Sequence, residues 1–495
     1  MNKPLLACLS AALVLAVAAS RAESPAALDL PQIGEPADNS LSPSEEKALG
    51  AKVMSQLYGG NYLLEDPELS DYVSALGWKL AASARSRGQP LTFFMVRDAR
   101  INAFALPGGY VGINAGLMLA ASNESEVAGV LGHEIAHVTQ RHIARTQEDT
   151  QVATVATWLA VIAAIIAGSA DPDVVVGALS VGQAMNYQRQ VNYTRAHELE
   201  ADRVGIQTMA RAGFDPAAMG SFFVKLEQQS RLYGSGLPEI LRTHPLTTNR
   251  IAEARSRAAE MPKVSVKDAL DFGLMRARAR VLSSERPSEA MDYFGNELAA
   301  GHDTAANRYG LAMALSLQGQ GAEAQRTLAP LLEQHPRQVN LSLLQGRILL
   351  LQHRNDEAVA LFRRTLQLFP RYAPAVLDTA DALMAAGRPE DARQLLLARD
   401  QTVSSQLEAY NLLAQAAREM GNLPEASYQN AMYLYLRGDA GNALAQLDAG
   451  LRLPNLSTQD RARLLAKRQE VRASLPENWR PPREQQRIGA LDDGS

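Results

Sequence analysis

The second half of the chain repeats itself every 34 residues, and this period limits the folds that it can adopt. Small residues recur at this spacing, at Ala290, Ala324, Ala358, Ala392 and Ala426. Large apolar residues follow one helical turn later, at Phe294, Leu328, Phe362 and Leu396, and Asn430 breaks the series. Turn residues complete the pattern, namely Gly319, Gly387, Gly421, Pro336 and Pro370. Because a small side chain lets two helices approach closely, the pattern predicts stacked antiparallel helical hairpins.

A helical hairpin of this length is typical of a tetratricopeptide repeat, although a generic helical bundle is the alternative. A further glycine and alanine pair, Gly438 and Ala443, extends the predicted array to about residue 470. Such arrays bind peptides or partner proteins on a concave face and seldom carry chemistry. We therefore interpret His302, His335 and His353 as solvated or turn residues.

The N-terminus has the features of an export signal. Lys3 precedes an apolar run from Leu5 to Ala19, and Ser20-Arg21-Ala22 forms a small-x-small cleavage site. The single cysteine, Cys8, lies inside this signal. A lipoprotein box around Cys8 is the alternative, but most of the apolar run follows Cys8 instead of preceding it. The mature chain would lack cysteine, so any metal site must use histidine and carboxylate ligands.

Composition and the histidine distribution divide the chain into domains. Its 495 residues, net charge of -4 and pI of about 6.1 suit a protein of several domains and give no sign of nucleic-acid binding. Five of the eight histidines fall between residues 133 and 244, outside the repeats. The resulting prediction is a signal peptide at 1–22, a catalytic domain at 23–265, repeats at 266–475 and a flexible tail at 476–495.

The catalytic domain is predicted to be mainly helical with a small β-sheet. Ser42-Pro43-Ser44-Glu45 is typical of a helix start and opens a helical region to about Arg87. Residues 91–96 are predicted to form a strand. Residues 102–114, which contain Pro107-Gly108-Gly109, are predicted to form a bent strand or a hairpin. Helices are predicted from Ala115 and from Glu124 to about Arg145.

The last of these helices contains His133-Glu134-Ile135-Ala136-His137. Residues at i and i+4 share one face of a helix, so His133 and His137 can offer two imidazole nitrogens to one zinc ion. Glu134, beside the first ligand, can accept a proton from water and pass it to a leaving amine. An ordinary amphipathic helix with two histidines is the alternative.

A catalytic zinc needs a third protein ligand, and the best candidate lies in His197-Glu198-Leu199-Glu200-Ala201-Asp202. Glu198 and Asp202 share one helical face, so Glu198 could bind the metal while Asp202 supports a ligand or the substrate. His197 and Glu200 face elsewhere and remain alternative ligands.

These two motifs resemble the zinc metallopeptidases with HExxH and ExxxD motifs, the gluzincin-type family of the heat-shock protease HtpX and the prenyl-protein protease. Further matching pieces are the stretch at 102–118, "THPLTTNRIAEAR" at 243–255 and the repeats, as in a periplasmic branch of the family. The resemblance implies a mainly α metallopeptidase domain with a small sheet, followed by an all-α repeat solenoid.

The resemblance also implies roles for individual residues. His133, His137 and Glu198 would bind one Zn²⁺ per chain, Glu134 would be the general base and acid, and Asp202 would support the site. His244 would be a switch histidine that can take the fourth position at the zinc, and Arg250 would stabilise the oxyanion. The implied partners are unfolded or misassembled outer-membrane proteins and the β-barrel assembly machinery, in the periplasm.

Three further expectations concern the substrate and the rival function. The uncharged runs at 152–170 and 174–188 form a buried helical hairpin or lid, with a peripheral membrane contact when exposed, or alternatively two membrane passes. Residues 109–114 form an edge strand that pairs with an extended substrate. The rival function is a non-catalytic chaperone or adaptor in which the repeats do the work and the zinc is structural.

Overall fold

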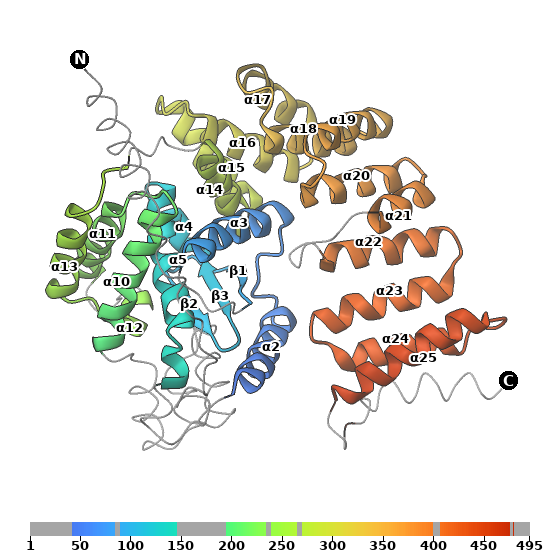
Figure 1. Cartoon of the computed structure of the whole chain (residues 1–495). Coiled ribbons are helices and arrows are strands. Elements are labelled where there is room, and N and C mark those ends of the chain that lie inside the picture. The colour runs from blue at the N-terminus through green and yellow to red at the C-terminus, as the bar shows by residue number, and fades with distance from the viewer. Residues whose placement is uncertain are drawn as a thin grey trace, which may run out of the picture.

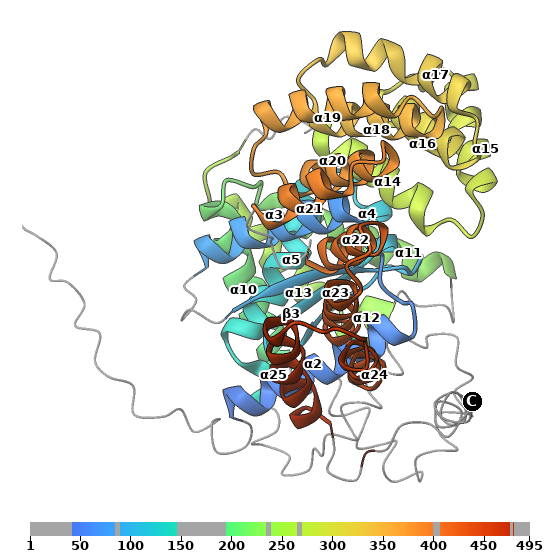
Figure 2. The same ribbon diagram turned by 90° about the vertical axis from the view of Figure 1, so that its right-hand side faces the viewer.

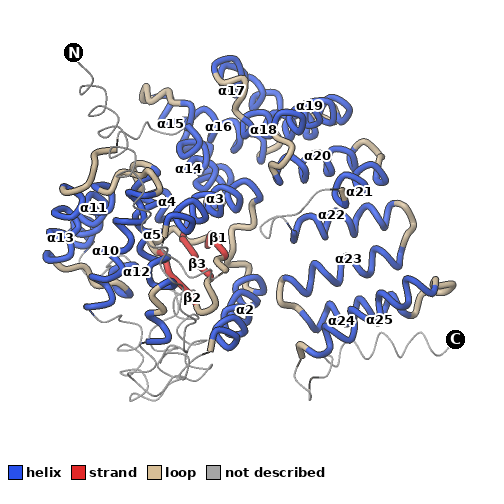
Figure 3. Tube along the Cα trace, viewed as in Figure 1, coloured by secondary structure: helices blue, strands red, loops and turns tan. Residues whose placement is uncertain are grey.

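The computed structural model describes residues 42–84, 90–145, 195–233, 239–264, 270–398, 406–475 and 479. A helical unit with a small sheet is followed by an array of paired helices that curves around one side of it (Figures 1 and 3). The predicted signal peptide, the segment at 152–188 and all but one residue of the predicted tail lie outside the described residues. Among the described helices, none is both long enough and apolar enough to cross a membrane.

Two helices form the predicted region that opens the first unit. Helix α2 (Pro43–Gly59) begins with the expected capping box, in which Ser42 and Glu45 each bond the other's backbone N–H. Helix α3 (Pro67–Ser83) begins at Asp66, whose carboxylate accepts a hydrogen bond from the Leu69 N–H. The connection between them forms an isolated bridge with the first strand, from Leu63 to Val96.

The sheet has three strands, β1 (Thr92–Val96), β2 (Ala103–Leu106) and β3 (Tyr110–Asn114). The hairpin of β2 and β3 confirms the prediction for 102–114, and Gly108 and Gly109 make its turn with φ of 80° and 85°. The strand order is β1-β3-β2, with β1 parallel to β3. The prediction that β3 is an edge strand is therefore wrong, because β3 pairs on both sides and β2 is an edge.

Helices enclose this sheet. Helices α4 (Ala115–Ala120) and α5 (Glu124–Thr139) follow β3, and helices α10 (Arg195–Arg211), α11 (Ala217–Tyr233), α12 (Glu239–Thr243) and α13 (Thr248–Ala259) complete the unit. One face of the sheet packs on α3 and α5, and the other on α2. Helix α5 is buried almost along its whole length, so the HExxH motif lies inside the domain.

The repeat array consists of helices α14 to α25, which pair in succession. Their bounds are α14 Leu270–Ser283, α15 Pro287–Ala299, α16 Ala305–Leu317, α17 Gly321–Gln334, α18 Val339–Leu351, α19 Asn355–Leu368, α20 Ala373–Ala385, α21 Pro389–Leu397, α22 Gln406–Glu419, α23 Leu423–Leu436, α24 Ala440–Leu451 and α25 Thr458–Ala473. All five periodic alanines are buried, which confirms the close helix contacts. His353 stands at the turn position that Gly319 and Gly387 occupy in the neighbouring repeats, and it adopts the same left-handed conformation, with φ of 58°.

The array contacts several elements of the first unit, including α2, α3 and α4. The N-terminus of α3 enters the array, where Arg278 and Arg347 contact Glu68 at 2.8 Å and 2.6 Å. Further along, the turn after α23 reaches α2, where Ser55 donates a hydrogen bond to the Gly438 carbonyl over 3.0 Å. Figure 2 shows the last helices of the array in front of the sheet and α2. The two halves of the chain therefore share a buried boundary.

Candidate metal centre

The close approach of α5 and α10 builds the site. Gly132 on α5 faces Gly205 on α10, and a Cβ added at Gly205 would lie 3.0 Å from the backbone nitrogen of His133. No side chain separates the two backbones at this crossing. Residues one or two turns from Gly205 on α10 are thereby brought against the HExxH face of α5.

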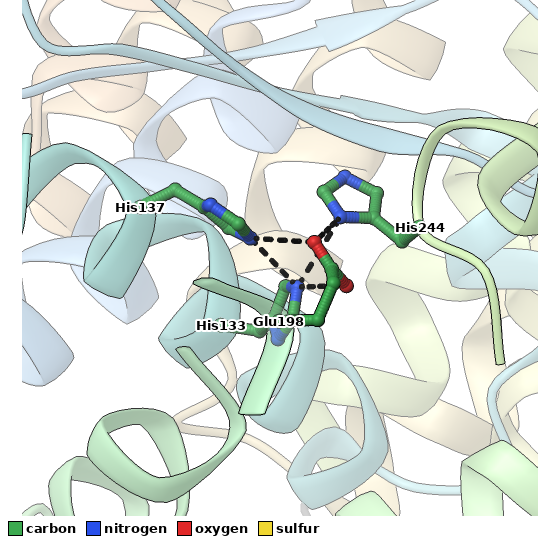
Figure 4. Close-up of side chains that lie close together, drawn as sticks. All are labelled: His133, His137, Glu198 and His244. Atoms are coloured by element: carbon green, nitrogen blue, oxygen red, sulfur yellow. Dashed lines mark hydrogen bonds and ion pairs between the residues drawn. The ribbon is translucent and has the colours of Figure 1, made fainter. Parts of the chain in front are cut away.

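Four buried side chains converge at this crossing, namely His133, His137, Glu198 and His244. One nitrogen or carboxylate oxygen from each lies within 4.8 Å of the others (Figure 4). The Nε2 atoms of His133 and His137 are 3.0 Å apart, and Glu198 Oε1 is 3.4 Å from His137 Nε2. The structure thus brings together the three predicted ligands and the predicted switch residue.

His244 is held at both ends of its segment. Its backbone N–H closes the last turn of α12 on the Ile240 carbonyl over 2.8 Å, and the Ile240 N–H reaches the Ile101 carbonyl just before β2. The ring directs Nδ1 toward Glu198 Oε1 at 3.0 Å and Nε2 toward Glu134 Oε1 at 3.5 Å. His244 therefore stands between the ligand group and Glu134.

Glu134 is fully buried, and among the described residues neither of its carboxylate oxygens has a hydrogen-bond partner, although Oε1 lies 3.5 Å from His244 Nε2. Burial of a carboxylate without donors is costly, so such a group is usually kept for a purpose other than stability. It follows the first histidine of the ligand group directly along α5. Apart from this contact with His244, the oxygen atoms are available to accept a proton inside a buried site.

Asp202 and Arg250 support the ligands. Asp202 Oδ1 accepts a hydrogen bond from His133 Nδ1 over 2.9 Å, as the shared helical face predicts. Arg250 binds both oxygens of Asp202, lies 2.7 Å from Glu198 Oε2 and donates to the Pro245 carbonyl over 2.9 Å. The guanidinium thus orients two carboxylates and the loop that carries His244.

Burial and neighbouring charges set the ionisation of the cluster. Burial lowers the pKa of His137 to about 3, so its ring is neutral and can act as a ligand. Burial also opposes ionisation of Glu198, yet His244 and His137 hold its pKa well below its ordinary value. Burial disfavours a charged His244, but Glu198 and Glu134 raise its pKa above the usual value.

Sequence reasoning assigned no role to His142, which lies beside the ligand group together with His197 and Glu200, the two residues named above as alternative ligands. His142 lies 2.9 Å from His137, measured between the two Nδ1 atoms, and its Nε2 is 3.3 Å from Glu200 Oε2. Its ring stacks on that of His197 with centroids 4.5 Å apart and planes 8° from parallel. A five-residue spacing from His137 would put His142 on another face of a regular helix. The helix ends first, however, and Arg141 turns the chain with φ of 52°.

The donor set fits a metal ion. Two histidines and a carboxylate with a neighbouring buried glutamate are the composition of a catalytic zinc site, and a fourth donor lies within reach. The fold and the site thus define a metallopeptidase joined to a helical repeat array.

Comparison with known proteins agrees with this class. Peptidase family M48 matches residues 67–258, and tetratricopeptide repeats match 309–373 and 349–403. The β-barrel assembly-enhancing protease of Escherichia coli strain K12 is 34% identical over 97% of this chain and 98% of its own. This chain therefore belongs to the β-barrel assembly-enhancing proteases of peptidase family M48.

Other relatives cover smaller parts of the chain. A putative β-barrel assembly-enhancing protease of Vibrio cholerae is 43% identical over 54% of this chain and 55% of its own. The mitochondrial metalloendopeptidase OMA1 of Arabidopsis thaliana is 30% identical over 33% of this chain and 31% of its own. Metallopeptidase relatives thus extend to proteins that match only a third of the chain.

Proposed function

We propose that this protein is a zinc-dependent endopeptidase in which His133, His137 and Glu198 hold one Zn²⁺. The observation that carries the proposal is the buried donor set beside Glu134, whose oxygens have no hydrogen-bond partner. A structural metal site has no use for a buried carboxylate next to its first ligand that lacks a hydrogen-bond donor among the described residues. This feature favours a peptidase over the rival chaperone or adaptor with a structural zinc.

The chemistry follows from the positions of the side chains. When bound, zinc polarises the scissile carbonyl and lowers the pKa of water. Glu134 accepts a proton from the attacking water and delivers it to the leaving amine. Asp202 holds His133 through Nδ1, and Arg250 fixes Asp202 and Glu198, so the ligand atoms keep their directions during the reaction.

An extended substrate would pair with the free edge of β2. This strand bonds to β3 along one side and packs against α5, which carries the catalytic residues. Main-chain pairing at a sheet edge aligns a substrate without demanding a particular sequence. Such permissive recognition suits unfolded chains of varied sequence.

The biological role is proposed from the relatives and from the predicted export signal. The protein would act in the periplasm on unfolded or misassembled outer-membrane β-barrel proteins. The repeat array would contact the barrel assembly machinery, because such arrays present surfaces for partner proteins. The family name of the relatives states the link to β-barrel assembly, and it carries this part of the proposal.

Zinc content is the first test. We expect the purified protein to contain one equivalent of zinc by elemental analysis. A chelator should remove both the metal and the hydrolysis of casein, and an equivalent of zinc should restore hydrolysis. Activity that survives complete loss of the metal would contradict the proposal.

His244 is expected to keep the enzyme latent. Its ring occupies the space between the ligand group and Glu134, where water and the substrate carbonyl must enter. The substitution His244→Ala should therefore increase casein hydrolysis or self-cleavage several-fold, measured as an initial rate at equal zinc content.

The matched control is His302→Ala, which removes a histidine that is exposed and bonded to a glutamate in the repeats. It should leave the rate unchanged. A decrease in the rate of His244→Ala would show instead that His244 takes part in catalysis.

A further inference from the structure

We propose that His142 and Glu200 form a relay that positions the metal ligand His137. This inference rests on the proposed zinc site and assigns a role to two residues outside its ligand set. The relay is defined as the chain His137, His142, Glu200 and Arg145. The link from His137 to His142 is 2.9 Å and that from His142 to Glu200 is 3.3 Å. At the end of the relay, Arg145 Nη1 lies 3.1 Å from Glu200 Oε2.

The metal sets the direction of the hydrogen bonds. His137 Nε2 faces the ligand group, so its Nδ1 must carry the proton once Nε2 is bound to metal. His137 then donates to His142 Nδ1, which leaves the His142 proton on Nε2. The His142 Nε2–H group then donates a hydrogen bond to Glu200 Oε2. Each group thus has one tautomer and one orientation.

The other ligand histidine is held in an equivalent but shorter way. His133 donates through Nδ1 directly to Asp202, and Arg250 neutralises that carboxylate. For His137, an imidazole is inserted between the ligand and the carboxylate, and Arg145 plays the part of Arg250. Both carboxylates come from α10, two and four residues after Glu198, so one helix supplies a ligand and both supports.

The backbone is shaped to make the first link. Helix α5 ends at Thr139, and the left-handed Arg141 returns the chain so that His142 lies beside the preceding turn. A residue with a large side chain adopts this conformation only where its surroundings enforce it. Arg141 is anchored to Glu46 of α2 over 3.2 Å, and His142 is fully buried against His197.

The test compares two substitutions that separate hydrogen bonding from packing. The substitution His142→Phe keeps an aromatic ring in contact with His197, but this ring cannot accept a hydrogen bond from His137. Asparagine leaves a gap, yet its Oδ1 stands near the position of Nδ1 and can accept. We expect His142→Phe to weaken zinc binding about 10–100-fold and His142→Asn to weaken it less, as for other groups that orient metal ligands.

Zinc dissociation into a chromophoric chelator is the measurement, with the metal itself as the probe. A role in packing alone predicts the opposite order, because the phenylalanine variant fills the site better. Equal dissociation rates for both variants and the wild type, or faster dissociation from His142→Asn than from His142→Phe, would overturn the relay.

The partly exposed Glu200 provides an independent measurement that does not endanger the fold. Glu200→Gln should speed zinc dissociation about 3–10-fold, and this effect should vanish in the His142→Phe background, because the relay is already broken there. Additive effects would contradict the relay. Wild-type protein that binds no zinc would instead refute the proposed function, so the two failures are distinguishable.

Discussion

Replacing Glu134 with glutamine is expected to abolish peptide hydrolysis while zinc binding and the fold are retained. Glutamine has the same size but cannot accept a proton from water. Loss of a general base typically reduces the rate by about 10²–10⁴-fold. Because neither Glu134 oxygen has a hydrogen-bond partner, the substitution breaks no hydrogen bond of the fold. We therefore expect kcat/KM for a casein-derived peptide to fall at least about a hundredfold.

The control for this variant is Glu124→Gln at the start of the same helix, where the carboxylate accepts a hydrogen bond from Tyr72. It should keep nearly full activity. Glu134→Gln protein with an unchanged zinc content and more than a tenth of the wild-type rate would refute the role of Glu134. If the inactive variant still supported assembly of outer-membrane proteins in cells, the repeat scaffold would carry the main biological role.

Local periodicity explains which site residues the sequence could predict. His133 and His137, like Glu198 and Asp202, lie one helical turn apart, so their shared faces follow from helix geometry alone. His244 depends on a loop that folds back over the site, and only the family resemblance indicated it. His142 was missed because the positive φ of Arg141 is not visible in the residue spacing.

The sheet shows the same limit. The turn at Pro107-Gly108-Gly109 predicts a hairpin, because those residues favour a reversal of the chain. It does not show that β1, which β2 separates from β3 in the sequence, pairs in parallel with the side of β3 that faces away from β2. Among the described strands, β3 is therefore interior to the sheet and β2 lies at an edge.

The array shows the limit at a larger scale. Its period predicts how each helix packs on the next, since those contacts repeat within 34 residues. Glu68 is 210 and 279 positions away in the chain from its partners Arg278 and Arg347, so the repeat period does not predict these contacts. A glutamate in the first turn of a helix is usually explained by the helix dipole. In the folded chain, Glu68 also forms ion pairs with two arginines of the array.

The substitution Glu68→Gln is expected to have the largest effect on stability. Glu68 is completely buried, and its Oε1 lies 2.8 Å from Arg278 Nη1 and 2.6 Å from Arg347 Nη1. Asp66 also binds Arg278, at 2.7 Å, so two carboxylates balance two guanidinium groups. Removal of one charge from such a buried group costs about 3–5 kcal/mol, because its partners stay buried without compensation.

Two controls separate this effect from a general loss of charge. Glu357→Gln removes an exposed carboxylate paired with Arg354 and should leave the free energy of unfolding nearly unchanged, because solvent screens this pair. Asp378 contacts Arg347 in the same cluster, but burial raises its pKa to about 7. The unfolded carboxyl titrates near pH 4, so between about pH 4 and pH 7 the folded form holds a proton that the unfolded form lacks. The stability of the wild type relative to Asp378→Asn therefore falls as the pH rises from about 4 to about 7.

Calorimetry of the full chain can measure these differences. The boundary between the two units lies at Glu68, so its substitution should lower the first unfolding transition by roughly 5–10 °C and separate the unfolding of the array from that of the peptidase unit. The unfolding temperature of Asp378→Asn relative to that of the wild type should be higher at pH 6 than at pH 4. If Glu68→Gln and Glu357→Gln unfold at the same temperature, the buried cluster does not couple the two halves of the chain.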